Sequence, residues 1–276
     1  MPEGPEVRVI VEQLNSQVRG RTIQSIEIVG GRYARKGPPP GFDHLPDAPL
    51  LIKSVSSKGK FIYFSLFTLG EDWHIFNTLG MSGTWSVDPV NVRYKHGHVR
   101  FHLDDGNVMT FIDTRNFGTL KFSPGYIELN KKLDELGWDP LRTNEIPEAW
   151  ILKRVMKKPN RNVTEILMDQ KIFAGVGNYI KAEVLYRAQI SPHRKAFEIQ
   201  DMEWINLCDQ IRAVVSESLA AKGTTIRHYR DALGESGSFQ NFLRVYGRKV
   251  DPGGNSVVRE TTPDKRTTHW VPEIQK

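Results

Sequence analysis

The sequence predicts an α+β protein in three parts: an antiparallel β-sandwich over residues 1–125, a helical domain over 126–240 and a β-hairpin over 241–276. Three observations support this prediction. Short runs rich in β-branched and aromatic residues, separated by Gly, Asn, Asp and Pro, dominate the first part, which is typical of a sandwich or barrel. After Pro124 the apolar residues recur at helical spacing. From about Phe242 strand-like alternation returns, with turn residues between the alternating runs.

The first part begins with a helix and continues with strands. Apolar residues from Val7 to Val18 follow helical spacing, and Gly20 closes the segment. The stretch 37–41 combines glycine with three prolines and must be a loop, whereas Asp104–Asn107 favours a hairpin turn. The predicted strands are Ile23–Val29, Ile52–Val55, Phe61–Phe67, Trp73–Phe76, Gly83–Val87, His98–Leu103, Val108–Phe111 and Thr119–Phe122.

The remaining parts have helical and then hairpin patterns. The predicted helices cover Leu129–Leu136, Glu145–Met156, Asn162–Asp169, Asn178–Ala188 and Glu198–Leu219. Turn residues at Gly247, Asp251–Gly254 and Thr262–Asp264 divide the tail into the strands of the final hairpin.

Composition and charge narrow the class of protein. The 276 residues carry a net charge of +6 and contain 39% hydrophobic residues, so the chain can bury a core and favours a polyanionic partner, either nucleic acid or an acidic membrane surface. Cys208 is the single cysteine, which excludes an intrachain disulfide and a cysteine-cluster metal site. No apolar run approaches the ~18 residues of a membrane span, and the start lacks signal-peptide character. We therefore expect an intracellular, soluble protein without a membrane partner.

The N-terminus carries the sharpest chemical feature. Removal of Met1 is expected before a residue as small as Pro2, and it exposes a secondary amine. An α-amino group has a pKa of about 7.7–8.0 against about 10.4 for lysine, so a useful fraction is neutral at pH 7. A neutral amine can attack a sugar C1′ and form a Schiff base, and Glu3 and Glu6 lie close by in the sequence for proton transfer. Taken alone, the segment more often forms a stiff polar leader.

Six segments along the chain form one pattern: Met1–Val7, Ser57–Phe61, Leu79–Gly83, Asp113–Gly118, Leu167–Leu185 and Val245–Lys249. Together they resemble the formamidopyrimidine-DNA glycosylase / endonuclease VIII (Fpg/Nei) family. The resemblance implies a bifunctional DNA glycosylase with strand-cleaving lyase activity in base excision repair, acting on damaged double-stranded DNA. It also implies a helix–two-turn–helix motif in the helical domain. Because the matches follow one another from the first residue to the tail, the resemblance is specific.

The resemblance assigns chemical roles to four residues. Pro2 becomes the Schiff-base nucleophile, and Glu3 becomes the acid/base group that helps to release the base and open the sugar. Lys60 contacts a phosphate near the lesion and donates a proton during elimination, although a lysine at a strand end is more often simply solvated. Arg266 matches an arginine in the C-terminal finger of the family, which binds phosphates around the lesion. Without the resemblance, Arg266 would be interpreted as an exposed charge in a loop.

The resemblance also implies a set of DNA contacts. One trio fills the gap left by the extruded nucleotide, where an apolar wedge, a ring and a guanidinium can stack against the orphan base. The trio is Met81, Arg115 and Phe117, of which Met81 and Phe117 are individually more common as core residues. Asn178 holds a phosphate at the start of a helix, after a turn that Gly175 and Gly177 permit.

Two further residues complete the expected contacts. His96 aligns with a histidine of the family that contacts DNA, whereas the neighbouring His98 is more often a structural residue. Glu6 is expected to belong to the substrate-binding residues beside the N-terminus.

The tail departs from the family pattern. Most members end in a four-cysteine zinc finger, but the corresponding positions here are Gly253, Ser256, Val271 and Ile274. None of these residues can bind zinc as a thiolate does, so we expect a zincless finger without a metal or other cofactor. The hairpin is expected to be held by packing, with Val257, Val258, Trp270, Val271 and Ile274 as candidates.

The preferred lesion and the host stay open. The start with Gly4 and the segment Lys58–Phe61 look like the endonuclease VIII side, which favours oxidised pyrimidines. The segment 224–239 has about the length of the lesion-capping loop of the formamidopyrimidine side, so formamidopyrimidines and 8-oxoguanine are also candidates. The balance of β- and δ-elimination is open too. The expected location is the cytoplasm of a bacterium or the nucleus of a eukaryote, and a monomer suffices.

Two other classes of function compete with this hypothesis. A catalytically silent DNA-binding protein could use the same helical motif and hairpin, but binding alone does not need the N-terminal amine of Pro2 together with Glu3 and Lys60. A metal-dependent nuclease is disfavoured by the missing metal cluster.

Overall fold

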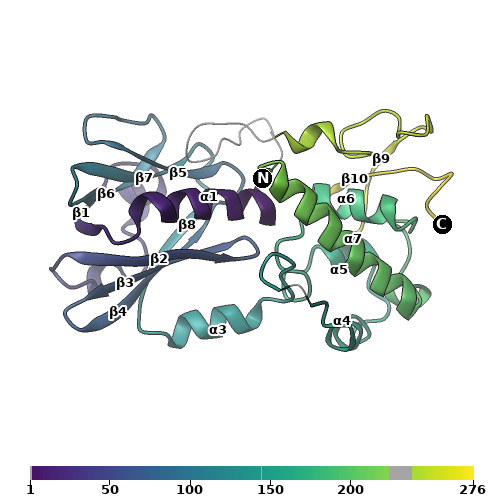
Figure 1. The fold of residues 1–276 in the computed structure, drawn as a ribbon, viewed down its shortest axis with the longest axis horizontal. Coiled ribbons are helices and arrows are strands. Elements are labelled where there is room, and N and C mark those ends of the chain that lie inside the picture. Colours follow the sequence, from purple (N-terminus) through teal and green to yellow (C-terminus); the bar gives the residue numbers. More distant parts are fainter. Residues whose placement is uncertain (1, 144, 224–237) are drawn as a thin grey trace. The chain divides into compact units, whose positions relative to one another are not determined.

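The computed structural model describes residues 2–143, 145–223 and 238–276. They form two compact units, of which the first contains Pro2 and residues 6–134 and the second contains residues 3–5, 135–223 and 238–276. The predicted α+β class is confirmed, because an antiparallel sheet, a helical region and a terminal hairpin follow one another along the chain (Figure 1). The predicted domain boundaries after residues 125 and 240 stay predictions. Residues 224–237 of the expected lesion-capping loop lie outside the described residues.

The first unit consists mainly of helix α1 (Gly4–Val18) and eight strands. The strands are all antiparallel and follow the order β5-β7-β6-β1-β2-β3-β4-β8. Each predicted strand is present, with ends that differ by at most a few residues. The observed strands are β1 (Thr22–Ile28), β2 (Leu50–Lys58), β3 (Phe61–Thr68), β4 (Glu71–Thr78), β5 (Gly83–Pro89), β6 (Gly97–Leu103), β7 (Asn107–Asp113) and β8 (Thr119–Pro124).

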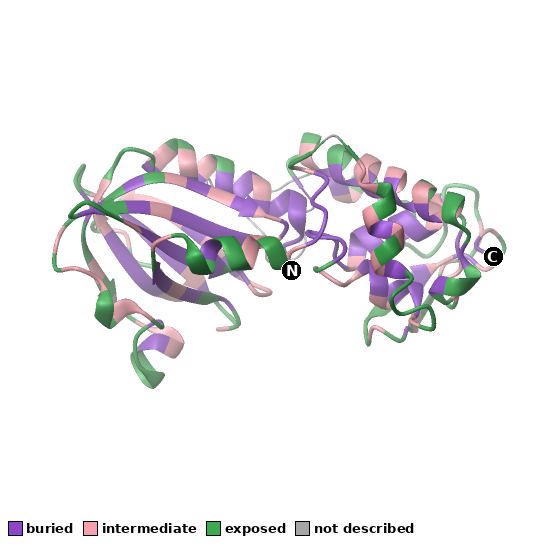
Figure 2. Ribbon diagram, turned by 90° about the horizontal axis from the view of Figure 1, so that it is seen from below, coloured by how far each residue is buried: buried purple, intermediate pink, exposed green. Residues whose placement is uncertain are grey.

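The sheet folds into two layers at the junction of β1 and β2. These strands pair only at Thr22–Leu51 and Ile23–Leu50, so the halves on either side can turn toward each other. Phe64 of β3 packs against Trp85 of β5 with ring centroids 5.0 Å apart, although the two strands lie in different halves of the order. Burying such side chains contributes about 1.5–3 kcal/mol each. Figure 2 shows the buried stripes along these strands. The apolar side of α1 joins the same core through Val7, Ile10, Val11, Leu14 and Val18.

One short helix of the first unit was not predicted. Helix α2 (Gly31–Lys36) has six residues, which is too short for helical periodicity to show in the sequence. Helix α3 (Ile127–Glu135) follows β8, as expected from the leucine spacing.

The second unit contains helices α4 (Glu148–Val155), α5 (Val163–Leu167), α6 (Asn178–Arg187) and α7 (Asp201–Ala220). Helix α5 begins with a capping box, in which the Asn162 side chain accepts a 2.8 Å hydrogen bond from the N–H of Thr164 and the Glu165 carboxylate accepts a 3.2 Å bond from the N–H of Asn162. Residues 179–185 of α6 are all buried, so this helix runs through the centre of the unit. Helix α7 begins three residues later than expected, because a short 3-10 turn, Ala196–Glu198, precedes it. Within the described residues, none of the helices is long and apolar enough to cross a membrane.

The terminal hairpin consists of β9 (Val258–Thr261) and β10 (Thr267–Trp270). Val271 is fully buried and packs with Ala182 of α6 and with Val257 and Ile274, as predicted for a hairpin held by packing. The prediction is wrong for Val258, which is 37% exposed because β9 is the outer strand while β10 lies against α6. Trp270 is half-buried beside the ring of His193.

Candidate active site and nucleic-acid interface

Glu3 is fixed at the start of helix α6. Its side chain is buried, and its Oε1 accepts a 3.0 Å hydrogen bond from the backbone N–H of Tyr179. Its Oε2 accepts a second, 3.3 Å bond from the N–H of Ile180. The first-turn amides of a helix have no partners within the helix and carry partial positive charge, so they stabilise the ionised carboxylate. The residue beside the proposed nucleophile is therefore held in one orientation.

The glycines before α6 admit this N-terminal segment. A Cβ atom at Gly177 would overlap Cδ of Glu3, so no side chain fits there while Glu3 keeps its position. Gly175 has φ +97°, and its carbonyl accepts a 3.0 Å hydrogen bond from the N–H of Gly4. The sequence suggested a turn whose amides face a phosphate, and that contact stays a prediction. In the structure the N–H of Gly175 donates a 3.0 Å hydrogen bond to the side-chain oxygen of Gln170, while its carbonyl binds the N-terminal segment.

Three other predicted residues of the first unit have clear positions. Pro2 is buried, and Glu6 is fully buried in the first turn of α1. Lys60 is half-buried in the two-residue turn that joins β2 to β3, beside Gly59 with φ +56°. Nearby, Lys58 anchors the end of β2 by donating a 2.8 Å hydrogen bond to the carbonyl of Leu133. The chemical roles of these residues stay predictions.

Asp113 joins the two loops that carry the predicted gap-filling residues, residues 79–83 and 113–118, which we call the probing loops. This carboxylate is fully buried, and its Oδ1 accepts a 2.6 Å hydrogen bond from the hydroxyl of Ser82 and a 3.1 Å bond from the N–H of Arg115. Its Oδ2 accepts a 2.7 Å bond from the N–H of Gly118. The loops also touch through their backbones, because a Cβ at Gly80 would lie 2.8 Å from the nitrogen of Gly118.

The predicted gap-filling trio lies on these joined loops. Phe117 is 54% exposed, so it is not a core residue, and the Arg115 guanidinium lies 5.1 Å from its ring centroid. Met81 is half-buried in the β4–β5 turn. His96 lies beside the loop that carries Arg115 and Phe117, because its carbonyl accepts a 3.0 Å hydrogen bond from the N–H of Asp113. Sequence reasoning included Asp113 only as part of a motif and missed its positioning role, as it did for Ser82.

Helix α6 also positions the terminal hairpin. The Asn178 side-chain amide donates a 2.9 Å hydrogen bond to the carbonyl of Thr267, the residue after Arg266. Farther along the helix, the fully buried carboxylate of Glu183 accepts hydrogen bonds of 2.9–3.1 Å from the N–H groups of Arg244, Val245 and Tyr246. The structure thus brings Glu3, Asn178 and the hairpin that carries the exposed Arg266 to one helix. The anchoring role of Glu183 was missed, although it lies inside a recognised motif.

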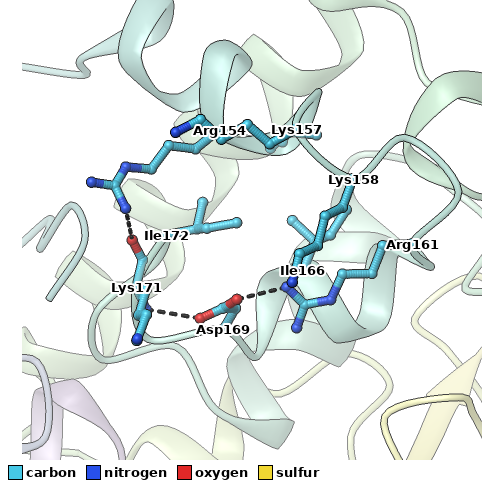
Figure 3. Close-up of a pocket in the computed structure, with 9 residues that line it drawn as sticks. Arg154, Lys157, Lys158, Arg161, Ile166, Asp169, Lys171 and Ile172 are labelled. Atoms are coloured by element: carbon cyan, nitrogen blue, oxygen red, sulfur yellow. Dashed lines mark hydrogen bonds and ion pairs between the residues drawn. The ribbon is translucent and has the colours of Figure 1, made fainter. Parts of the chain in front are cut away.

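A basic pocket of about 150 Å³ lies in the helical part of the second unit (Figure 3). Arg154 lies 4.2 Å from the centroid of the Trp150 ring and donates a hydrogen bond to the carbonyl of Lys171. Arg161 forms a 2.6 Å ion pair with Asp169. Burial opposes the charge of Asp169, but the bonds from Arg161 and the Lys171 amide outweigh it and lower its pKa. The pocket lining also includes Lys157, Lys158 and Lys171.

The surplus of positive charge makes this pocket a candidate phosphate-binding surface. Its one carboxylate is paired with Arg161, so the three exposed lysines are left to attract an anion. Sequence reasoning included Lys171 only as part of the Leu167–Leu185 segment and did not single out Lys157 or Lys158, because single charges in a helical region are usually just solvated.

No group of three or more His, Cys, Asp or Glu side chains suitable for a metal ion occurs in the described parts of the chain. The expected independence from metal and cofactor stays a prediction. In the turn that contains Gly253, Asp251 accepts hydrogen bonds of 2.7 and 3.0 Å from Asn255 and one of 3.1 Å from the Tyr186 hydroxyl.

Comparisons with known proteins agree with this arrangement. Three family models match: the formamidopyrimidine-DNA glycosylase N-terminal domain over residues 1–120, the H2TH domain over 136–230 and the C-terminal domain over 237–276. The chain is 32% identical to the formamidopyrimidine-DNA glycosylases of Bacillus licheniformis and Bacillus subtilis, with 100% of this chain and 99–100% of each relative covered.

Solved structures give the same result. A point mutant of the Lactococcus lactis FPG, in a complex with a Fapy-dG containing DNA, matches with a TM-score of 0.86 and 27% identity over 100% of both chains. The wild-type Lactococcus lactis FPG with an oxidized pyrimidine containing DNA matches with a TM-score of 0.85 and 26% identity, again over 100% of both chains. The chain belongs to the formamidopyrimidine-DNA glycosylase family, and its C-terminal domain is of the zincless type.

Proposed function

We propose that the protein is a bifunctional DNA glycosylase and abasic-site lyase of base excision repair, with the amine of Pro2 as its nucleophile. The observation that carries this proposal is the carboxylate of Glu3, locked onto the first-turn amides of α6 beside Pro2 in the chain. The relatives named for formamidopyrimidine-DNA glycosylase, and the related structures with damaged DNA, support the substrate class.

The proposed reaction begins at C1′ of the extruded nucleotide. The Pro2 nitrogen forms a bond to C1′ while the bond from C1′ to the damaged base breaks, and the base leaves with the electron pair and gains a proton. The carboxylate of Glu3 takes up the proton that the Pro2 nitrogen loses after its attack. Glu3 then passes this proton to the ring oxygen as the sugar opens, which yields an iminium ion. Loss of a proton from C2′ then expels the 3′ phosphate, and a further elimination expels the 5′ phosphate. Lys60 supplies a proton during elimination.

The proposed DNA contacts come from both units. Met81, Arg115 and Phe117 fill the gap in the duplex, His96 and Glu6 bind beside the lesion, and Asn178 and Arg266 bind phosphates. Oxidised pyrimidines, formamidopyrimidines and 8-oxoguanine are the candidate lesions, and a monomer suffices for the reaction.

Borohydride trapping on a duplex with an abasic site tests the nucleophile. The processed protein should give a covalent adduct, whereas a variant with a blocked N-terminus should give none. An adduct of equal yield in both would contradict the role of Pro2. Strand cleavage should persist in EDTA, and its loss there would favour a metal-dependent nuclease instead.

A second substitution separates the two chemical steps. Glu3→Gln should lose base release from oxidised DNA but keep trapping on preformed abasic sites, because the amine still reaches C1′. Parallel duplexes with thymine glycol, formamidopyrimidine and 8-oxoguanine would then rank the lesions. A protein that binds all of these duplexes but neither traps nor cleaves them would be a silent DNA-binding protein.

A further inference from the structure

Lys181 is a fully buried lysine inside helix α6. Its ammonium forms a 2.5 Å ion pair with Asp264, whose side chain is only 3% exposed. Burial lowers the pKa of Lys181, and the hydrogen bond and charge of Asp264 oppose that effect. A buried charge without a partner is strongly destabilising, so each member of this pair needs the other once the pair has formed.

Asp264 organises the turn between β9 and β10. Its other oxygen, Oδ1, accepts a 2.6 Å hydrogen bond from the Thr262 hydroxyl and a long, 3.4 Å bond from the N–H of Arg266. The turn is closed by a 3.1 Å hydrogen bond from the N–H of Thr262 to the carbonyl of Arg266. Lys265 sits in the left-handed region with φ +59°, which an isolated chain rarely adopts at lysine. Contacts around Asp264 therefore fix the backbone from which the Arg266 side chain projects.

The other anchors of the hairpin act elsewhere. Glu183 holds the amides of residues 244–246, and Val271 is packed into the cluster with Ala182. Asn178 holds Thr267 at the start of β10. Losing the Lys181 ammonium would therefore loosen the turn at residues 262–266 while these other contacts keep the hairpin attached.

We propose that Lys181 is a positioning residue for Arg266, acting through Asp264. The inference rests on the proposed function, in which the Arg266 guanidinium binds phosphates around the lesion. A turn that is already ordered spares the entropy cost of ordering an exposed arginine when DNA binds. The buried ion pair gives this hairpin, whose sequence has no zinc thiolates, a fixed link from helix α6 to its phosphate-binding tip.

A double-mutant cycle between Lys181→Met and Arg266→Ala tests this coupling. The readout is affinity for a duplex with a tetrahydrofuran abasic-site analogue, which binds but cannot undergo base release. Lys181→Met should weaken binding about tenfold in the wild-type background and less than about twofold in the Arg266→Ala background. Equal losses in both backgrounds, or no loss in a folded variant, would overturn the proposal. Arg187→Met is the matched control, because Arg187 lies on the same helix but pairs with Glu217 of α7.

Asp264→Asn provides a second route if Lys181→Met does not fold. It changes only the turn side of the pair and should show the same dependence on Arg266, and additivity in this cycle would also overturn the proposal. The affinity of the Arg266→Ala variant distinguishes failure of the proposed phosphate contact from failure of the positioning role. If Arg266→Ala alone keeps full affinity, the phosphate contact is wrong and the positioning role falls with it. If Arg266→Ala weakens binding but the cycles are additive, only the positioning role is wrong.

Discussion

The Ser82 hydroxyl donates a 2.6 Å hydrogen bond to the buried carboxylate of Asp113, and this bond joins the turn that carries Met81 to the loop that carries Arg115 and Phe117. The three proposed gap-filling residues come from two segments that lie far apart in the chain. Their common position therefore depends on a buried polar contact rather than on their own packing.

Asp113→Ala should separate these loops. The change removes the acceptor of the Ser82 hydroxyl and of the Gly118 N–H, at a cost of about 1–3 kcal/mol for each donor that stays buried. The N–H of Arg115 keeps its 3.0 Å hydrogen bond to the Ser82 oxygen. We expect at least about a tenfold loss in the rate of lesion extrusion, since flipping a base costs a few kcal/mol that the inserted side chains must offset. Stopped-flow fluorescence of 2-aminopurine beside the lesion measures this rate.

Ser86→Ala is the matched control, because Ser86 also donates to a carboxylate, that of Asp88, but on the β5 strand. It should leave extrusion unchanged. Wild-type extrusion by a folded Asp113→Ala variant would show that the loops do not need this contact.

Gly177→Ala should displace Glu3. The added Cβ would overlap the Glu3 carboxyl carbon, so the carboxylate must leave the amides of Tyr179 and Ile180. We expect base release to fall by about 100-fold or more, as for loss of a positioned acid/base group. Single-turnover excision assays check this. Gly20→Ala is a control with open space around its Cβ and φ +80°, and it should cost stability but not excision. An equal loss of excision in both variants would mean that only folding was affected.

Neutralising the basic pocket should reduce the salt dependence of DNA binding. Lys157→Ala, Lys158→Ala and Lys171→Ala each remove one charge from the pocket lining, and each phosphate contact so removed should lower the slope of log K against log salt by about 1. Lys153→Ala is the control, because Lys153 is exposed on α4 but does not line the pocket. Identical slopes for the control and the pocket variants would exclude a phosphate contact there.

His269 should make the protein acid-sensitive. Burial, reinforced by the nearby charges of Arg259 and Lys181, lowers its pKa from 6.5 to about 4. The unfolded chain therefore binds a proton at higher pH than the folded protein does. The contribution of neutral His269 to the free energy of unfolding is fully present above pH 6.5. This contribution, up to roughly 3 kcal/mol, is lost as the pH falls from 6.5 to about 4.

His269→Phe keeps a ring against Tyr246, whose centroid lies 4.9 Å from that of His269, but it cannot titrate. Urea unfolding at pH 7.5, 6 and 5 measures the effect, and the wild-type protein should lose more stability across this range than the variant. Parallel pH profiles for the two proteins would assign the acid sensitivity to other groups.

Much of the architecture was predictable because it depends on local patterns. The eight strands, helix α1 and the helices after Pro124 follow from alternation or helical spacing, and each of these signals is read within a few residues. Helix α2 was not predictable, because six residues show no full period. Val258 was placed in the packed hairpin by its type, whereas its exposure follows from the outer position of β9.

By itself the sequence determined most of the secondary structure, the absence of zinc thiolates from the finger and the candidate residues from Pro2 to Arg266. Only the tertiary structure decided how these residues are held: Glu3 by the amides of α6, the probing loops by Asp113, and the tip of the hairpin by Lys181 and Asp264. The physical reason is that each contact joins residues far apart in the chain. A buried charge needs a partner wherever the fold brings one, and no local pattern records which partner that is.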